Sequence, residues 1–208
     1  MVPVTETELS MANYTGPKVK LSRRVGVPIA DIPKHTNRQL TPPGVHGFRG
    51  RRLRDFGVRL NEKQKLRYHY NVLEKQFRGY LDQSTRAKGN TGEVLLTLLE
   101  RRLDNVVRRL GFARTIWAAR QIVVHGHVLV NGVKTDRPSF RVKIGDEVTI
   151  KEKAHKLIRE HLESQPGHDV PSWLSFDPSS LTARVVGEPT RDQVPFDVNM
   201  NLIVEFYR

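Results

Sequence analysis

Apolar side chains recur at helical spacing in the middle of the chain. Leu66, Tyr70, Leu73 and Phe77 follow one another at intervals of four, three and four residues. Because an α-helix turns once in about 3.6 residues, this spacing places them on one face of a helix. The pattern predicts that regular structure begins near Asn61 and that a helix runs through these four positions.

A second helical run follows Asn90. Asn90 and Glu93 have the spacing of a capping box, in which two side chains satisfy the amide groups at the start of a helix. Gly111 is a natural stop, because glycine readily adopts the left-handed conformation that ends helices. The spacing allows either one helix or two helices end to end. The apolar positions of this run are Leu95, Leu99, Leu103, Val106 and Leu110.

The pattern then changes from helix to strand. Residues 115–125 predict a short helix that Thr115 can cap. Asn131-Gly132, between two apolar stretches, is the strongest short signal for a β-hairpin. Gly145-Asp146 predicts another turn, and residues 147–150 alternate like a strand. Residues 101–152 therefore predict two short helices packed on a small sheet.

The two ends of the chain differ from this middle part. Residues 1–10 lack apolar periodicity and predict a disordered extension. Residues 12–60 are dense in proline and glycine, which argues against long regular elements there. Residues 153–162 return to a helical pattern, and residues 202–207 predict a strand or an extended segment.

Basic residues are concentrated in one part of the chain. The formal net charge is +13, and residues 11–70 hold fourteen basic but only three acidic side chains. Residues 163–208 hold three basic and seven acidic side chains. Such a separation of charge predicts a polyanionic partner for the basic part, and nucleic acid is the commonest polyanion. The acidic end is expected to pack on protein instead.

Composition excludes several classes of protein. There is no cysteine, so disulfides and thiolate metal sites are excluded. No apolar run approaches the roughly 20 residues that span a bilayer. The polar start of the chain does not resemble a signal peptide, which favours the cytoplasm. His125 and His127 lack a third metal ligand nearby, and no P-loop or Rossmann fingerprint is present, so neither a metal nor a cofactor is expected.

Arginines decorate the predicted helices of residues 101–120. A guanidinium group matches phosphate oxygens, so these side chains suit RNA contacts, although a solvated helix face is an equal alternative. Together with the basic segment they form the predicted RNA-binding set. Its members are Lys18, Lys20, Arg23, Arg24, Arg49, Arg51, Arg52, Arg54, Lys63, Lys65, Arg67, Arg102, Arg109, Arg114 and Arg120.

Several motifs in the same region resemble a known RNA-binding module. Residues 102–107 read R-L-D-N-V-V, residues 109–113 read R-L-G-F-A, residues 118–121 read A-A-R-Q and residues 127–132 read H-V-L-V-N-G. Similar modules occur in the fourth protein of the small ribosomal subunit, some pseudouridine synthases, tyrosyl-tRNA synthetases and heat-shock RNA-binding proteins. The module alone leaves all four open.

The rest of the chain resembles only the first of these families. From about Met11 to the C-terminus, motifs follow in the order typical of the bacterial or organellar form of the fourth small-subunit ribosomal protein. They are G-P-K at 16–18, K-L-S-R-R at 20–24, P-G at 43–44 with H-G at 46–47, E-K-Q-K at 62–65, K-G-N-T-G-E at 88–93, W-L at 173–174 and L-I-V-E at 202–205. Two departures are residues 1–10, which precede the usual start, and the absence of the four-cysteine zinc cluster of some members.

The resemblance implies a fold and a function. The fold is α+β, with the RNA-binding module (residues 101–162) inserted in a mostly helical domain (61–100) to which residues 163–208 return. The basic segment of residues 11–60 is then a further rRNA-binding part. Trp173, Phe176, Phe196, Phe206 and Tyr207 are expected to pack against the helices of residues 61–100.

The implied function is structural. It comprises early binding to the 5′ domain of small-subunit 16S rRNA, which nucleates assembly, and a contribution to translational accuracy. Contacts with small-subunit ribosomal protein five and other neighbouring proteins are implied, as is a single copy in the ribosome. The basic stretch from Arg49 to Arg54 is implied to lie near the mRNA entrance, although on the residues alone further rRNA contacts are equally supported.

Two other functions are weaker. In pseudouridine synthases the aspartate of an Arg-Leu-Asp motif is the nucleophile, but here Asp104 lies inside the module, and residues 163–208 are too few for a catalytic domain. We therefore expect a capping or packing role for Asp104 and no enzyme activity. A free-standing RNA chaperone would need neither the helical domain nor the acidic end.

Overall fold

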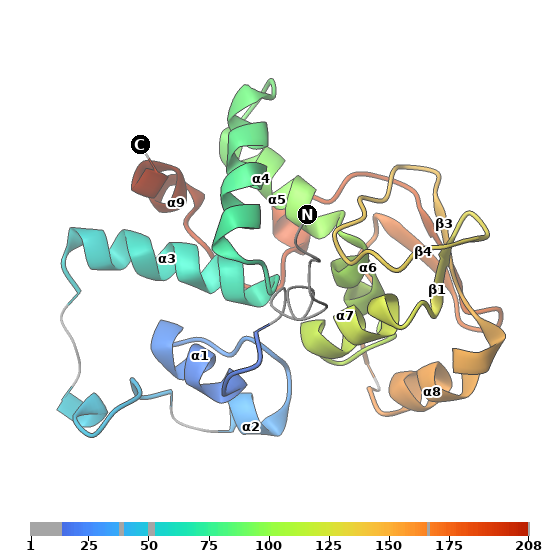
Figure 1. The fold of residues 1–208 in the computed structure, drawn as a ribbon, viewed down its shortest axis with the longest axis horizontal. Helices are drawn as coiled ribbons and strands as arrows, with labels where there is room; N and C mark the ends of the chain where they lie inside the picture. The colour runs from blue at the N-terminus through green and yellow to red at the C-terminus, as the bar shows by residue number, and fades with distance from the viewer. Residues whose placement is uncertain (1–13, 38–39, 50–52, 166, 208) are drawn as a thin grey trace, which may run out of the picture. The chain divides into compact units, whose positions relative to one another are not determined.

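The computed structural model describes residues 14–37, 40–49, 53–165 and 167–207. It separates into two compact units, each described by itself here: residues 1–81 with 198–208, and residues 82–197. The sequence prediction for residues 1–10 falls outside the described residues. The predicted α+β class is confirmed (Figure 1).

The first unit is helical. Its elements are α1 (Lys18–Val25), α2 (Pro33–Thr36), the 3-10 helix η2 (Gly47–Arg49), α3 (Asp55–His69), the first part of α4 (Glu74–Arg86) and α9 (Met200–Tyr207). Helix α9 lies beside α3 although the two are far apart in sequence (Figure 1). Regular structure therefore begins well before Asn61. The prolines and glycines of residues 12–60 limit the helices there to short lengths but do not prevent helix formation.

The helix predicted through Leu66 and Phe77 is two helices. Helices α3 and α4 are separated at Asn71, whose φ of 48° lies in the left-handed region. Asparagine tolerates this conformation better than most residues. Leu66, Tyr70 and Phe77 are buried as expected, but Leu73, the fourth residue of the predicted face, is 38% exposed because it lies between the two helices.

The C-terminal residues form a helix, so the prediction of a strand at 202–207 is wrong. The side chain of Asn199 accepts the amide hydrogens of Asn201 and Leu202, which caps the first turn. Met200 and Ile203 are buried on the inner face of α9. The local cap and the helical spacing of these two residues thus prevail over the strand preference of the β-branched side chains.

The second unit packs helices on an antiparallel sheet. Its elements are α5 (Thr91–Glu100), α6 (Leu103–Arg109), α7 (Ile116–Val124), β1 (Val128–Val130), β2 (Val133–Lys134), β3 (Glu147–Ile150), α8 (Glu152–Glu163), β4 (Leu174–Asp177), β5 (Thr182–Val185) and the 3-10 helix η3 (Arg191–Gln193). The strand order is β2-β1-β3-β5-β4. The run from Asn90 to Leu110 is thus two helices, α5 and α6.

The sheet has one buried and one solvated face. Val128, Val148, Ala183 and their neighbours in register are buried in one core with side chains of α6, α7 and α8. The predicted caps and turns are present at three places. Asn90 caps α5 through the amide of Gly92, one residue before the Glu93 amide that the predicted capping box would use. Thr115 accepts a backbone amide hydrogen at the start of α7, and Asn131-Gly132 turns with positive φ at both residues.

The acidic end does not return as a whole to the helical domain. Strands β4 and β5 extend the module's sheet, and Trp173 is buried in the core beneath it. Phe176 packs edge-on against Phe112 of the same core, with ring centroids 5.4 Å apart. The prediction that Trp173 and Phe176 pack on the helices of residues 61–100 is therefore wrong, because their strands complete the sheet. Only residues 198–208 belong to the first unit.

Candidate nucleic-acid interface

Helix α1 presents basic side chains to solvent. Lys18, Lys20 and Arg24 are exposed. Arg23 is turned inward: its Nε donates to the carbonyl oxygen of Thr41 at 2.9 Å and its Nη2 to that of Pro42 at 3.3 Å. Of these four predicted RNA contacts, Arg23 thus holds the chain at residues 41–42 against α1, while the other three face outward.

A buried hydroxyl fixes the turn between α1 and α2. The Oγ of Ser22 accepts the amide hydrogen of Ile29 at 3.2 Å and lies 2.5 Å from Nδ1 of His35. Both side chains are almost fully buried. Burial, with the positive charge of Lys18, lowers the pKa of His35 below its ordinary value. This short contact between two buried side chains links α1 to α2.

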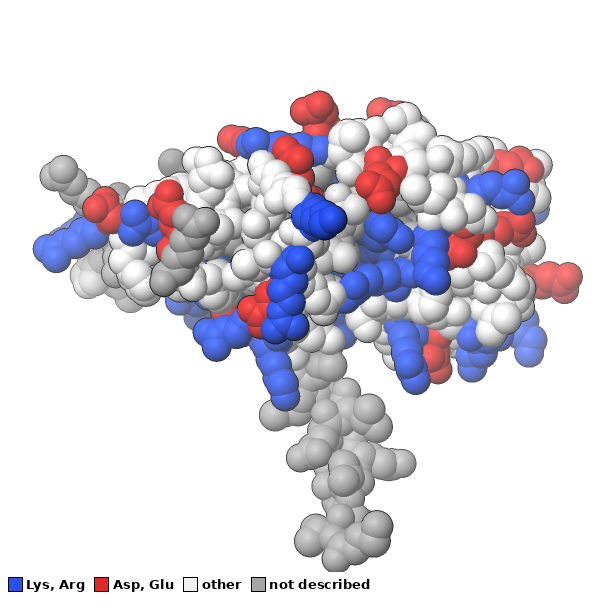
Figure 2. All heavy atoms as spheres, turned by 90° about the horizontal axis from the view of Figure 1, so that it is seen from above, with Lys and Arg blue, Asp and Glu red and all other residues white. Residues whose placement is uncertain are grey.

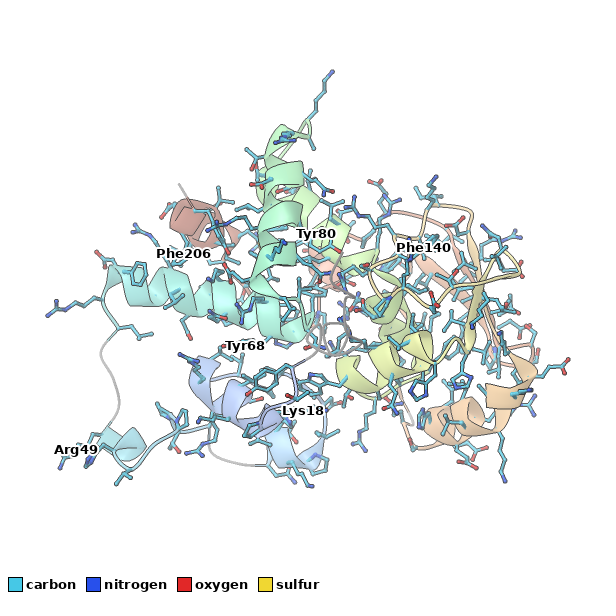
Figure 3. The ribbon with its side chains drawn as sticks, in the orientation of Figure 1. Lys18, Arg49, Tyr68, Tyr80, Phe140 and Phe206 are labelled. Atoms are coloured by element: carbon cyan, nitrogen blue, oxygen red, sulfur yellow. The ribbon has the colours of Figure 1, made fainter. Side chains whose placement is uncertain are left out.

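The predicted mRNA-facing residues are only partly described. Arg49 is exposed on η2 and points away from the helices of its unit (Figure 3). Arg54 is exposed just before α3. Arg51 and Arg52 lie outside the described residues.

The cations of α3 are held by carboxylates. Lys63 is 5% exposed and donates to both oxygens of Glu74 at 3.1 Å. Arg67 binds the same carboxylate at 2.7 Å, and Lys65 binds Glu62 at 2.6 Å. The ammonium group of Lys63 is buried in this pair, so the predicted RNA contact of Lys63 requires that it leave Glu74. Lys65 and Arg67 are partly buried ion-pair partners.

Glu74 joins the C-terminal helix to this group. The hydroxyl of Tyr207 donates to Glu74 at 2.5 Å, and the ammonium group of Lys63 lies 4.5 Å from the centre of the Phe206 ring. Burial acts to raise the pKa of Glu74, but hydrogen bonds from Tyr207, Arg67 and Lys63 outweigh it and lower the pKa to about 2. Burial and the hydrogen bond to Glu74 raise the pKa of Tyr207. These contacts seat α9 on α3 and α4, as predicted for Phe206 and Tyr207.

Arginines of the module's helices are also turned inward. Arg102 and Asp104 form a two-pronged ion pair with 3.0 and 2.6 Å contacts, and the two side chains are 1% and 0% exposed. The predicted RNA contact of Arg102 therefore requires that this buried pair open. Arg120, 10% exposed, lies 3.8 Å from the same carboxylate.

A second buried carboxylate engages the end of α6. Glu100 accepts from Arg109 at 2.6 and 3.0 Å and from the side-chain amide of Asn105 at 2.8 Å. Little of Arg109 or Arg120 therefore remains to face a phosphate. Of the four module arginines in the predicted set, Arg114 is the one whose side chain is exposed.

Sequence analysis missed a basic loop that the module does expose. Residues 135–146, between β2 and β3, carry the exposed side chains of Arg137, Phe140, Arg141 and Lys143. The signal was available, since a phenylalanine stands there among cations without an intervening acidic residue. The loop lies outside the helical and hairpin patterns on which the predicted RNA-binding set was based.

Charge on the surface is mixed. Figure 2 shows acidic side chains among the lysines and arginines on the face seen from above. On this face, phosphate contacts therefore depend on local groups of cations. Helix α1 and the loop after β2 each carry such a group of exposed cations.

The described residues give little support for metal binding, for catalysis by Asp104 or for a membrane-spanning helix. Among the described residues, no three histidine, aspartate or glutamate side chains are grouped to hold a metal ion. His125 and His127 pack ring against ring, with centroids 6.0 Å apart. Asp104 is buried with both oxygens bonded, which is unsuited to nucleophilic attack. Within the described part of the chain, every helix is too short or too polar to cross a membrane.

Comparison with known proteins gives a consistent result along the whole chain. The family model described as the ribosomal protein S4/S9 N-terminal domain matches residues 13–100, and the S4 domain model matches residues 101–148. Proteins called small ribosomal subunit protein uS4 from Persephonella marina, Aquifex aeolicus and Geobacillus thermodenitrificans are 48%, 49% and 45% identical to the chain. Each alignment covers 95% of this chain and 99% of the relative.

Proposed function

The chain belongs to the family of small ribosomal subunit protein uS4, and from that membership we propose that it is a structural constituent of the small ribosomal subunit that binds its rRNA. The observation that carries the proposal is the similarity over 95% of the chain to proteins of that name. It includes both the basic first part and the RNA-binding module.

The geometry of the first unit supports rRNA binding. Lys18, Lys20 and Arg24 project from a short helix whose neighbours are fixed by the Ser22–His35 contact and by Arg23. Cations held on a fixed backbone lose little freedom when they meet phosphates, and releasing counterions from the RNA favours the complex. The basic segment of residues 11–60 is the first rRNA-binding part, and the module of residues 101–162 is the second.

The more detailed part of the proposal is the role that the family has in the ribosome. The chain binds the 5′ domain of 16S rRNA directly and early, which nucleates assembly of the subunit. As one copy per subunit, it contacts ribosomal protein five and other neighbours and contributes to translational accuracy. The basic residues around Arg49 lie near the mRNA entrance.

Binding to isolated RNA tests the proposal. The purified chain should bind a transcript of the 5′ domain of small-subunit rRNA without other proteins, and bind a transcript of the 3′ domain much more weakly. Replacing Lys18, Lys20 and Arg24 together by alanine should reduce the salt dependence of binding by roughly 0.7–0.9 logarithmic units per lost phosphate contact. The matched control replaces Lys75, Arg86 and Lys88, three exposed cations that lie outside the basic segment and the module. Equal affinity for both transcripts would contradict the proposal.

A free-standing RNA chaperone with the same module is the second candidate. Sedimentation of a cell extract through sucrose separates the two. Stoichiometric migration with small subunits supports the ribosomal function, whereas a large pool of free protein supports the chaperone.

A further inference from the structure

The loop that joins β2 to β3 carries positive charge next to an aromatic ring. Between Arg137 and Lys143 there are three basic side chains and no acidic one. Arg137, Arg141 and Lys143 are exposed, and Phe140 is 37% exposed. Two acids flank this stretch: Asp136 is exposed next to Arg137 in the sequence, and Asp146 accepts hydrogen bonds from the backbone amide of Lys143 and from Asn131.

The backbone of this loop is fixed to the start of α6. The amide of Leu103 donates to the carbonyl oxygen of Phe140 at 2.8 Å, and the amide of Asp104 donates to that of Pro138 at 3.2 Å. Helix α6 has no side-chain cap, so these two carbonyl groups take the place of one. Phe140 is therefore held by the same amide groups that begin the helix.

Further contacts hold the other end of the loop. Val142 is fully buried, and its backbone exchanges bonds with Arg101: its amide donates to the carbonyl oxygen of Arg101 at 3.0 Å, and its own carbonyl accepts from Arg101 Nε at 2.8 Å. Arg141 donates to the side chain of Gln83. With Val142 inward, Arg141 and Lys143 face outward on either side of it.

Because several arginines of the module's helices are buried in ion pairs, the exposed cations of the loop become candidates for contacts with RNA. Arg102, Arg109 and Arg120 form ion pairs with Asp104 and Glu100 inside the unit. The module must then reach phosphates with other cations. An exposed aromatic residue on a fixed backbone, with exposed cations near it in the sequence, suits single-stranded RNA, because a base can stack on the ring while its phosphates meet the cations.

We propose that the loop Arg137–Lys143 is a contact for unpaired RNA, in which a base stacks on Phe140 and neighbouring phosphates pair with Arg137 and Lys143. The inference rests on the proposed rRNA binding and adds a particular site and ligand to it. Arg141 is a positioning residue, tied to Gln83. Any base can stack on the ring, so the contact selects unpaired structure over sequence.

The affinity of ring variants tests the stacking. The full-length chain is bound to a transcript of small-subunit rRNA at fixed magnesium concentration. Stacking of one base on an aromatic ring corresponds to roughly 5- to 140-fold in affinity. Phe140→Leu, which keeps an apolar side chain, should weaken binding at least about fivefold. Phe140→Tyr, which keeps the ring, should bind like the unaltered chain.

Two further measurements distinguish RNA contact from a change of fold. The intrinsic fluorescence of Trp117 and Trp173, both buried in this unit, reports whether each variant unfolds at the same denaturant concentration. A photo-crosslinking amino acid at position 140 should join the chain to rRNA in assembled subunits. Arg137→Ala should lower the salt slope by roughly 0.7, the value for one single-strand phosphate contact.

The outcomes separate this inference from the function on which it rests. If the unaltered chain fails to bind rRNA, the proposed function is wrong. If it binds and a stably folded Phe140→Leu chain binds equally well, the loop contact alone is overturned. Crosslinking from position 140 to protein only would likewise overturn it and assign the loop to a protein neighbour.

Discussion

The guanidinium group of Arg102 holds both carboxylate oxygens of Asp104, at 3.0 and 2.6 Å, with almost no solvent exposure of either side chain. The amide of Asn105 also donates to Asp104, at 2.9 Å. The Arg-Leu-Asp motif of residues 102–104, which in the sequence suggests RNA contact or catalysis, thus forms a buried ion pair that stabilises the fold. It lies where the loop Arg137–Lys143 joins α6.

Removing one member of this pair should destabilise the second unit strongly. Asp104→Ala leaves the charge of Arg102 buried without its two-pronged partner, which costs about 3–5 kcal/mol. Glu147→Gln is the matched control, because the Glu147–Arg184 pair is exposed and its contact is 3.7 Å long; it should cost less than about 1 kcal/mol. Urea unfolding followed by tryptophan fluorescence measures both. Similar midpoints for the two variants would show that the buried pair is not a support.

Mild acid should destabilise the first unit through His35. Because its pKa in the folded chain is lowered from 6.5, the unfolded chain takes up this proton at a higher pH than the folded chain. The contribution to stability is therefore complete above about pH 6.5 and is lost as the pH falls from there through the folded pKa. Circular dichroism during urea unfolding at several pH values follows this loss.

The matched variant for this test is His35→Asn, which has an amide in place of the imidazole and does not titrate. Other histidines titrate in both chains, so the difference between the two pH profiles isolates His35. The unaltered chain should lose more stability than the variant between pH 7.5 and 5.5. Parallel profiles would mean that the Ser22–His35 contact does not depend on the neutral imidazole.

Local signals in the sequence predicted much of the module. The Asn131-Gly132 turn and the Thr115 cap depend on residues close together in the chain, so they are visible without the fold. The break at Asn71 was not visible, since asparagine tolerates both helical and left-handed conformations. The helical end of the chain was missed because the Asn199 cap was overlooked and its β-branched residues favour strands.

Which cations face outward depends on partners distant in sequence. Lys63 is neutralised by Glu74 and covered by Phe206, a residue far along the chain. Arg109 is neutralised by Glu100, which lies on another helix. A basic residue in a promising motif can thus serve the core, whereas Arg137 in an unremarked loop stays exposed. Charge counting located the basic segment, but burial decides which residues can reach a phosphate.

The hydroxyl of Tyr207 should contribute to the docking of α9. Tyr207→Phe keeps the ring near Phe77 and Phe206 but removes the hydrogen bond to Glu74. Since Glu74 is ionised at neutral pH but 40% exposed, we expect a loss of about 1 kcal/mol. The stability that Glu74 gains from its lowered pKa is present above about pH 4.5 and is lost as the pH falls towards 2.

The difference between Tyr207→Phe and the unaltered chain should therefore shrink in acid. Circular dichroism at pH 7, 4 and 2.5 measures it, with Tyr207→Leu as a comparison that also removes the ring and should lose more. A constant difference at all three pH values would show that the hydroxyl does not act through the carboxylate.

Residues 82–197 should fold without the rest of the chain. They contain the whole sheet and its core, including Trp173 and Leu174. A fragment of residues 101–162 lacks β4 and β5, which leaves one edge of β3 unpaired and uncovers the core. We expect cooperative unfolding, seen by fluorescence, for the longer fragment and none for the shorter. Cooperative unfolding of both would show that the module folds without β4 and β5.

The basic stretch around Arg49 should matter most for structured messages. Arg49 is exposed on a short 3-10 helix, with Arg51 and Arg52 following it in sequence. Guanidinium groups bind phosphates of any sequence, so such a stretch can hold an incoming single strand without selecting it. Replacing Arg49 and Arg52 by alanine should slow translation through a stable hairpin and leave an unstructured message unaffected. Lys34→Ala, at an exposed cation of α2, is the control for loss of charge in the same unit. Subunits must first be shown to assemble normally, because the same arginines can serve rRNA. If assembly fails, or if both messages are translated at equal rates, these residues are rRNA contacts and the proposed role at the mRNA entrance is wrong.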